Sequence, residues 1–248
     1  MEDYRANTYG DGFADVYDDW YGDVSDVDGT VSRITALADG RPVLELGVGT
    51  GRLALPLARR GVETHGIDAS AAMIEQLKAK PGADAVTVTL ADMADFPVPE
   101  PDYFGVVLIA FNTFFNLTSA AAQQACLERI VTALQVGGHL VIEAFIPSAP
   151  PARPAGALDV RSVEIDRVHL AATWRDPVEQ KVWGQHIELT RSGVQLRPWL
   201  LRYVTPAELD AMTAAAGLEL TDRSSDWHGA PIDESSSRHV STYVSAGR

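Results

Sequence analysis

Short apolar runs alternate with segments of helical periodicity over the first 145 residues of the chain. The runs at 43–47, 62–67, 86–90, 103–111 and 139–145 predict strands, and the segments at 50–60, 71–80 and about 119–135 predict helices. The run at 103–111 is apolar on both faces, which is typical of a buried parallel strand. This alternation predicts a doubly wound, mostly parallel sheet with helices on both faces.

The pattern changes after Ile146. Four prolines, at positions 147, 150, 151 and 154, predict a linker, and alternating segments at about 160–174, 180–190 and 194–203 predict three antiparallel strands. Thr205 and Glu208 then form a capping-box pattern that opens a helix ending at Gly217. Strands at 218–226 and 239–244 complete the chain. We therefore expect an α/β fold with a Rossmann-like, mostly parallel seven-stranded sheet and an antiparallel β insert before the last helix.

The most informative segment is the turn from Glu45 to Leu53, between the first predicted strand and helix. Gly47, Gly49 and Gly51 permit positive φ angles and a close approach of the backbone to a ligand. The free N–H groups at the start of the following helix favour an anion or a carboxylate. Asp68 ends the second predicted strand, where a carboxylate can bind a ribose diol. Turn and acid together predict a site for a nucleoside-bearing cofactor.

The spacing of the glycines distinguishes between cofactors. A dinucleotide fingerprint requires a third glycine at position 52, where this chain has Arg52, and the chain has no Tyr-x-x-x-Lys pair. The pattern Gly-x-Gly-x-Gly, with Glu45 two residues ahead of it, resembles the cofactor loop of class I S-adenosylmethionine-dependent methyltransferases. A nicotinamide-dependent oxidoreductase and a non-catalytic, cofactor-binding partner subunit are the two alternatives to this interpretation.

The resemblance implies a role for each residue of the loop and of the strand ends. Glu45 would hold the glycine loop and the charged end of the cofactor, and Asp68 would bind the ribose hydroxyls. Asp92 would accept a hydrogen bond from the adenine amine while Met93 packs on the ring. The residues expected to bind S-adenosylmethionine are Tyr9, Tyr17, Glu45, Gly47, Gly49, Gly51, Arg52, Asp68, Ala69, Asp92, Met93, Ala110 and Phe111.

The segment 9–21 resembles the start of small bacterial methyltransferases that act on amino sugars and natural products. In those relatives a comparable Tyr-Gly…Tyr-Asp segment folds over the cofactor, which implies that Tyr9 and Tyr17 approach it. Helical phase alone also explains Phe13, Tyr17 and Tyr21 as an apolar stripe packed on the domain. The expected division is a helical lid at 1–36, a cofactor-binding core at 37–146, an insert at 147–204 that covers substrate or forms a dimer contact, and completion of the core at 205–248.

Composition limits the acceptor. The chain has 248 residues, 46% of them hydrophobic, and a formal net charge of −14. No basic cluster is longer than Arg59-Arg60, so a nucleic-acid partner is not expected. No apolar stretch reaches membrane-spanning length, and the acidic start lacks a signal-peptide pattern. The single cysteine, Cys126, fits a reducing cytoplasm. We expect a cytoplasmic enzyme with a small-molecule acceptor, and the edges of the insert are compatible with a homodimer.

Transfer from a sulfonium to N or O of an acceptor requires mainly alignment and exclusion of water. A general base is needed only if the nucleophile arrives protonated. The candidate bases are Glu143, His186 and His239, each of which has an alternative interpretation as a structural polar group. Candidate acceptor contacts are Tyr21, Asn112 and Phe115. No His/Cys/Asp cluster has the spacing of metal ligands, so no metal is expected.

Overall fold

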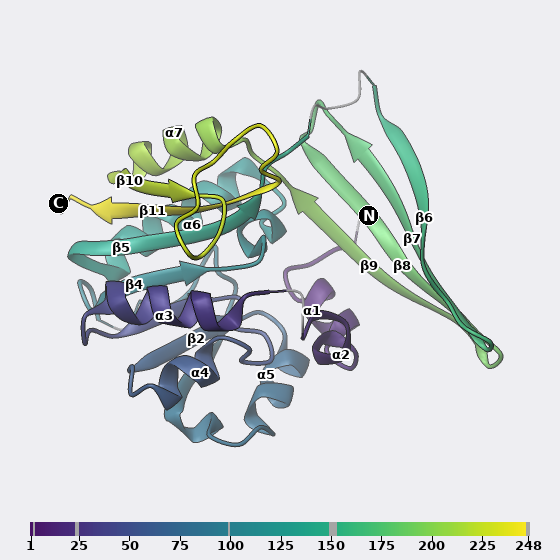
Figure 1. Ribbon diagram of the computed structural model, residues 1–248, viewed down its shortest axis with the longest axis horizontal. Helices are drawn as coiled ribbons and strands as arrows, with labels where there is room; N and C mark the ends of the chain where they lie inside the picture. Colours follow the sequence, from purple (N-terminus) through teal and green to yellow (C-terminus); the bar gives the residue numbers. More distant parts are fainter. Residues whose placement is uncertain (2, 23–24, 99, 149–152, 247–248) are drawn as a thin grey trace.

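The computed structural model describes residues 1, 3–22, 25–98, 100–148 and 153–246, and it contains two β-sheets (Figure 1). The larger sheet has seven strands in the order β10-β11-β5-β4-β1-β2-β3, of which only β11 runs opposite to the others. This confirms the mostly parallel, Rossmann-like sheet. Its strands are β1 (Val43–Leu46), β2 (Thr64–Asp68), β3 (Val86–Leu90), β4 (Phe104–Ile109), β5 (Leu134–Phe145), β10 (Leu218–Ser224) and β11 (Arg238–Ser245).

Helices cover both faces of the larger sheet. On one face, Val31 and Ile34 of α3 (Val27–Ala38) pack with Val106 and Leu108 of β4. On the other face, Leu127 of α6 (Ala120–Ala133) belongs to a second core cluster. All six residues of β4 are buried, as its apolar run predicts. The helices are α3 (Val27–Ala38), α4 (Ala54–Arg59), α5 (Ala71–Lys78), α6 (Ala120–Ala133) and α7 (Pro206–Ala216), with short 3-10 turns η1 (Ala83–Ala85) and η2 (Thr113–Asn116).

The N-terminal segment divides into two parts. Two short helices, α1 (Thr8–Phe13) and α2 (Tyr17–Tyr21), lie between the larger sheet and the smaller one (Figure 1). The third helix of the expected lid, α3, packs instead on the sheet, because Val31, Ile34 and Ala38 form one buried face. From here on, "the lid" denotes α1 and α2, residues 8–21.

The smaller sheet has four antiparallel strands where the sequence predicted three. They are β6 (Ala155–Val163), β7 (Arg167–Asp176), β8 (Lys181–Thr190) and β9 (Gly193–Arg202), and we call this sheet the arm. A turn at 164–166 divides the predicted segment 160–174, and Glu164 N–H donates to the carbonyl of Arg167 at 2.8 Å. The turn was missed because Ile165, at its tip, continues the apolar pattern although its side chain is 95% exposed.

Two predicted boundaries also change. The helix expected from Thr50 begins at Ala54, because the turn continues through Gly51, whose φ is +81°. The expected linker after Ile146 is shorter, since β6 starts at Ala155, and its residues Pro150 and Pro151 lie outside the described residues. Among the helices that the structure describes, none combines the length and apolar character needed to cross a bilayer.

Candidate functional site

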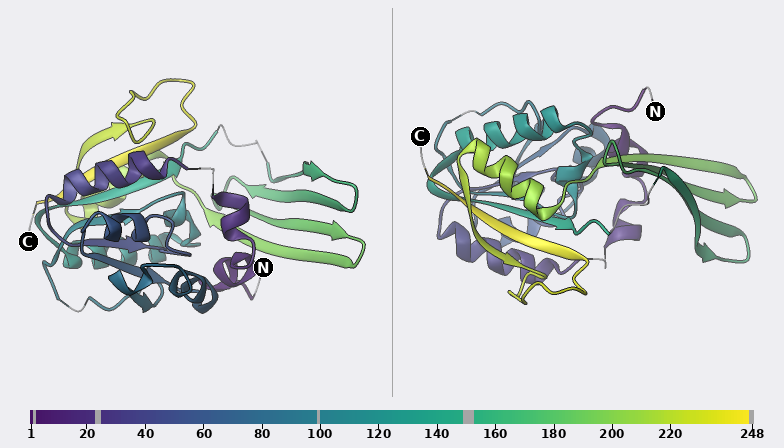
Figure 2. Two further views of the ribbon diagram at one scale, coloured as in Figure 1. Left: turned by 60° about the horizontal axis from the view of Figure 1, so that its bottom comes forward. Right: turned by 90° about the horizontal axis from the view of Figure 1, so that it is seen from above.

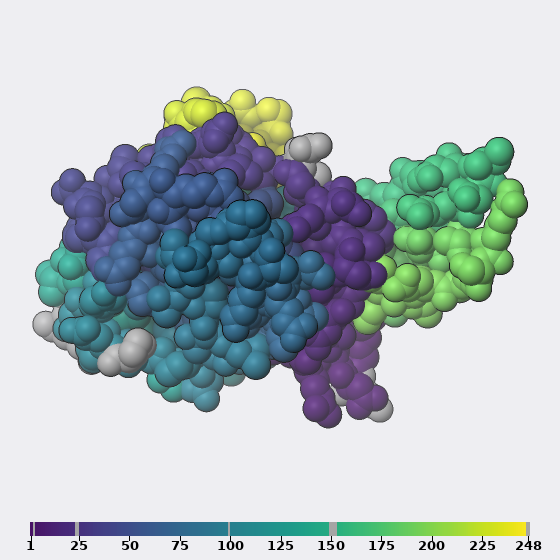
Figure 3. Space-filling model, turned by 90° about the horizontal axis from the view of Figure 1, so that it is seen from below, coloured from purple at the N-terminus to yellow at the C-terminus, as the bar shows by residue number. Residues whose placement is uncertain are grey.

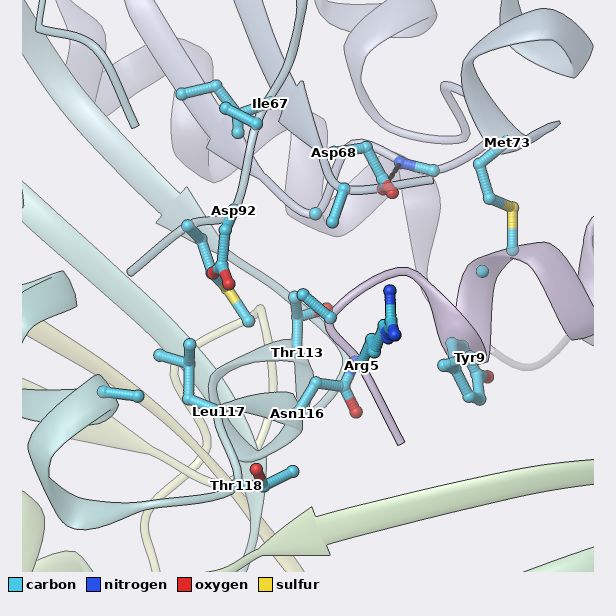
Figure 4. Close-up of a pocket in the computed structure, with 18 of the residues that line it drawn as sticks. Arg5, Tyr9, Ile67, Asp68, Met73, Asp92, Thr113, Asn116, Leu117 and Thr118 are labelled. Carbon is cyan, nitrogen blue, oxygen red and sulfur yellow. Dashed lines mark hydrogen bonds between the residues drawn. The ribbon is translucent and has the colours of Figure 1, made fainter. Parts of the chain in front are cut away.

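A cavity opens at the carboxyl ends of β1, β2 and β3, beneath the lid (Figure 4). This is the edge where open α/β sheets bind ligands. The glycine turn, the ends of β2 and β3, the lid and the loop after β4 all contribute to its wall. Eight of the thirteen residues expected to bind the cofactor line it: Tyr9, Tyr17, Gly47, Gly49, Asp68, Ala69, Asp92 and Met93.

The glycine turn brings the backbone against the cavity. Gly47 has a φ of +73°, and a Cβ added there would lie 2.3 Å from Cγ2 of Thr113. A side chain at this position is therefore excluded by both backbone conformation and space. Gly49, with a φ of +54°, directs its N–H to Oδ2 of Asp68 at 2.8 Å. The turn is thereby fixed to the acid at the end of β2.

Asp68 presents a fixed carboxylate to the cavity. Its Oδ2 accepts from Gly49 N–H, and its Oδ1 accepts from Ser70 N–H at 2.8 Å. Burial raises the pKa of this carboxyl, and the two backbone N–H groups oppose that shift. Each oxygen keeps acceptor capacity beyond these bonds, so the pair suits the two hydroxyls of a ribose.

Asp92, labelled in Figure 4, and the adjacent Met93 also line the cavity. Asp92 follows β3, and its Oδ1 accepts from Ala94 N–H at 2.8 Å, which orients the exposed carboxylate. Met93 is partly buried against the core and also lines the cavity. A carboxylate acceptor beside an apolar thioether suits the amine and the ring face of adenine, as the resemblance implies.

Glu45 and Arg52 are ionisable residues at the glycine turn with unused hydrogen-bonding atoms. Oε2 of Glu45 and both Nε and Nη1 of Arg52 are buried without a hydrogen-bond partner. Burial raises the pKa of Glu45 to about 8, although the charge of Arg52 acts in the opposite direction. Unpaired buried polar atoms are costly unless a ligand pairs them. Neither side chain lines the cavity in this structure, but a Glu45 carboxylate ionised beside a cation and the Arg52 guanidinium would suit the ammonium and the carboxylate of the methionine part of S-adenosylmethionine.

The lid is held over the cavity by polar contacts with the core. Ser70 Oγ donates to Oδ1 of Asp11 at 2.6 Å, and Thr50 Oγ1 donates to Oδ1 of Asp18 at 2.6 Å. Lys80 forms an ion pair with Asp18 at 2.6 Å. The glycine turn and both ends of α5 are thereby tied to the lid, and Tyr9 and Tyr17 of the lid line the cavity.

Glu143 and Asn112 do not line the cavity and have structural partners instead. Phe111 N–H donates to Oε2 of Glu143 at 3.0 Å, and Phe145 N–H donates to Oδ1 of Asn112 at 2.6 Å. Phe111 and Asn112 both have positive φ angles, +51° and +66°. These hydrogen bonds hold a left-handed backbone between β4 and η2. The side chains of Glu143 and Asn112 therefore stabilise the loop that lines the cavity without lining it themselves.

The two candidate histidines also lie away from the cavity. His239 is fully buried in β11, with its Nδ1 2.8 Å from Ser241 Oγ, and His186 of the arm contacts His169 across strands at 3.0 Å. Burial lowers the pKa of each to about 4. Both rings are therefore neutral near pH 7, and neither lines this cavity.

The remaining predicted residues lie behind the wall or beside it. Phe115 is fully buried, with its ring 4.9 Å from that of Phe145, and Tyr21 packs against Phe111 and Tyr17. Phe111, Phe115 and Tyr21 do not line the cavity, and neither do Ala110, Gly51, Glu45 or Arg52.

Sequence reasoning missed residues at the start of the chain and in the loop after β4. Tyr4 also lines the cavity, as do Arg5, Thr113, Asn116 and Thr118, which are labelled in Figure 4. The polar loop after the apolar run 104–109 was a usable signal, because loops at this edge of a sheet bind ligands. Tyr4 and Arg5 had no comparable signal. Among the described residues, no three His, Cys, Asp or Glu side chains gather as a metal site.

Comparison with known proteins agrees with this geometry. Residues 43–138 match the family model of the methyltransferase domain. The cypemycin N-terminal methyltransferase of a Streptomyces species is 31% identical over 201 residues, which cover 78% of each chain. The structure is similar to that of the CcbJ methyltransferase from Streptomyces caelestis, with a TM-score of 0.89, 40% identity and coverage of 98% of this chain and 100% of that one.

A more distant structure shares the fold. CalS10 from Micromonospora echinaspora, an amino pentose methyltransferase solved with S-adenosylmethionine bound, aligns with a TM-score of 0.67 at 22% identity, covering 92% of this chain and 96% of that one. The glycine turn, the two acids and these relatives lead to one family. This chain belongs to the S-adenosylmethionine-dependent methyltransferases.

Proposed function

We propose that this enzyme transfers the methyl group to the amine nitrogen of a small molecule. The proposal rests on the ionisable side chains that line the cavity, because none of them is left over as a base for the acceptor. They are Tyr4, Arg5, Tyr9, Tyr17, Asp68 and Asp92. Both acids lie at the positions assigned to ribose and adenine. Burial raises the pKa of Tyr4 to about 12 and raises the pKa of Tyr9 and of Tyr17, so these hydroxyls are neutral near pH 7.

This arrangement favours an amine over a hydroxyl as the nucleophile. An amine exchanges its proton with water and binds as the free base, whereas a hydroxyl needs a base in the site. The 31% identical relative is named for methylation at an N-terminus, which is also an amine. Transfer to oxygen is the second candidate, and it would require that Asp68 or Asp92 leave its expected cofactor contact.

The bound cofactor supplies a methyl group already activated on a sulfonium. The chain then has to hold both partners in line and to exclude water. Asp68 and Asp92 would hold the nucleoside, Glu45 and Arg52 would hold the charged end, and Tyr9 and Tyr17 of the lid line the cavity. The uncharged tyrosine hydroxyls orient the acceptor amine without protonating it.

The pH dependence of the rate tests the proposal. Acceptors would be two primary amines of different pKa, for instance an amino sugar and the amino terminus of a short peptide, each with its hydroxyl counterpart. We expect methylation of the amines only. For each amine, kcat/KM should rise with pH to a plateau, with its midpoint at the pKa of that amine. A profile that keeps one midpoint for every acceptor would indicate a base on the enzyme. Methylation of the hydroxyl counterparts would overturn the proposal.

A further inference from the structure

The lid lies between the core and the arm. Figure 2 shows the two short helices of the lid beside the arm, and Figure 3 shows the lid, in purple, between the core and the projecting arm. Of the described residues, none from the arm lines the cavity, whereas the lid contributes Tyr9, Gly10 and Tyr17 to its wall. Any effect of the arm on the cavity therefore passes through the lid.

The two helices of the lid are too short to hold their own position. Helix α1 has six residues and α2 has five, and neither begins with a side chain that caps it. Helices of one or two turns are unstable in water unless tertiary contacts hold them. The core provides such contacts through Thr50, Ser70 and Lys80. On its other side, α1 lies against β9 of the arm.

Arg197 of β9 is the polar contact between the arm and the lid. Its Nη1 and Nη2 donate to Oδ1 and Oδ2 of Asp15 at 2.6 Å and 2.9 Å. Asp15 lies in the lid, in the short connection between α1 and α2. A two-fold contact between a guanidinium and a carboxylate fixes the orientation of both groups as well as their distance.

The same guanidinium acts at the end of α1. Nη1 of Arg197 also donates to the backbone carbonyl of Gly12, in the last turn of this helix. The last carbonyls of a helix have no partner within it, and a cation is favourable at that end. Helix α1 has no basic residue in its own last turn. Arg197, 185 positions away in the sequence, therefore supplies the cation that α1 lacks.

Aromatic contacts lead from this helix end to the cavity. Phe13 follows Gly12 and is fully buried, and its ring stacks on that of Tyr9 with 4.5 Å between the centroids. The ring of His186, on the arm, meets Phe13 edge-on at 5.5 Å. Tyr9 lines the cavity. A shift of α1 away from the arm would therefore also move Tyr9.

The burial of Arg197 favours a role in position over a role in stability. Its side chain is 4% exposed, whereas that of Asp15 is 60% exposed. The Nε atom of Arg197 is buried without a hydrogen-bond partner. Taking a guanidinium out of water is costly, and an apolar side chain in its place often gives a protein of equal or greater stability. What this residue adds is a defined geometry between the arm and α1.

We propose that Arg197 is a positioning residue for methyl transfer, which holds α1 against the arm and thereby sets Tyr9 over the bound cofactor. The arm then controls how tightly the cofactor is held without lining its site. The proposal rests on the assignment of the cavity to S-adenosylmethionine, and it holds for an amine and for a hydroxyl acceptor alike.

Calorimetric titration with S-adenosylmethionine tests the proposal without an acceptor. Arg197→Met loses the contacts with Asp15 and Gly12, so we expect its affinity to fall about 10-fold, a common size for the coupling between two distant sites. Arg197→Lys keeps the charge but not the planar fork, and its affinity should lie between the two. Arg167→Met is the matched control, because Arg167 lies on the same face of the arm and pairs with Glu188 of the arm itself at 3.5 Å.

Hydrogen exchange read by mass spectrometry separates a shift of the lid from a general loss of structure. Arg197→Met should exchange faster in residues 8–21 and as slowly as the wild type in β4, with an unfolding temperature within a few degrees of wild type. Wild-type affinity in Arg197→Met would overturn the proposal. An equal loss of affinity in Arg167→Met, or a loss in Arg197→Met without faster exchange in the lid, would also overturn it.

Asp15→Ala keeps the test decisive if the variants of Arg197 do not fold. The side chain of Asp15 is mostly exposed, so its removal should leave the fold intact. Asp15→Ala should lose part of the affinity that Arg197→Met loses, since the bond to the Gly12 carbonyl remains. The double variant should bind no more weakly than Arg197→Met, because both substitutions remove one contact. Asp19→Ala, also on the exposed side of the lid, is the control. Equal affinity of Asp15→Ala and Asp19→Ala would contradict the proposal.

Discussion

Gly49 donates its backbone N–H to Oδ2 of Asp68 at 2.8 Å, which joins the glycine turn after β1 to the acid at the end of β2. Nineteen positions separate the two residues, but β1 and β2 are adjacent parallel strands whose carboxyl ends share one edge. The contact fixes the turn and leaves the carboxylate facing the cavity.

The space around Gly47 predicts a steric loss of stability. Gly47→Ala and Gly61→Ala both require a left-handed alanine, since the φ angles are +73° and +78°, but only the first places its Cβ 2.3 Å from Thr113. We expect Gly47→Ala to lower the free energy of unfolding by about 1–3 kcal/mol more than Gly61→Ala does. Urea unfolding measures both.

A second substitution isolates the contact itself. Thr113→Ser removes the methyl group that the new Cβ would meet, so it should restore part of the stability lost in Gly47→Ala. Equal destabilisation of Gly47→Ala and Gly61→Ala would contradict a steric contact between position 47 and Thr113.

The left-handed backbone at Asn112 predicts an order of stabilities. Asn112→Gly keeps access to the φ of +66° and loses the hydrogen bond from Phe145 N–H, whereas Asn112→Ala loses both. We expect Asn112→Ala to cost about 1–3 kcal/mol of unfolding free energy and Asn112→Gly to cost less. Unchanged stability of Asn112→Ala with a raised KM for the acceptor would instead support an acceptor contact for Asn112.

Glu45 predicts a specific pH dependence of stability without cofactor. Burial raises its folded pKa from near 4.5 to about 8, so the folded protein retains a proton that the unfolded chain has lost. The wild type should therefore lose stability relative to Glu45→Gln as the pH rises from about 5 to 8. Thermal unfolding of both proteins across this range measures the difference, and parallel curves would show that Glu45 ionises normally.

The contacts of the lid predict an effect on binding rather than on folding. Asp18 is half-exposed and bonds Thr50 and Lys80 across the closed lid. Asp18→Asn should weaken binding of S-adenosylmethionine several-fold and leave the unfolding temperature within a few degrees of wild type. Asp19→Asn, one residue away on the same helix, is the control. Equal binding by both variants would show that the closed lid does not depend on Asp18.

The core of the fold was predictable from sequence because each strand of a parallel sheet is an apolar run with its own stop signals. The cofactor loop was predictable for a related reason: the three glycines and Asp68 lie at strand ends that the topology brings together. The arm was harder to predict. Its extra turn contains the exposed Ile165, so the apolar pattern continues through a reversal of the chain.

The roles of individual polar residues were the least predictable. Glu143 and Asn112 are polar residues at the ends of apolar strands, which suggested the cavity. Each instead meets a backbone N–H more than thirty positions away. A sequence does not show which way such a side chain turns. Arg5 lines the cavity from a segment without regular structure, which periodicity cannot locate.

Calorimetric titration with S-adenosylmethionine tests the central claim most directly, with wild type, Asp68→Asn and the surface control Asp95→Asn compared. We expect micromolar binding by wild type and control, and binding about 10- to 100-fold weaker by Asp68→Asn, because an amide cannot replace both the charge and the acceptor for Gly49 N–H. Equal affinity for all three proteins would contradict the assignment of this cavity as the cofactor site.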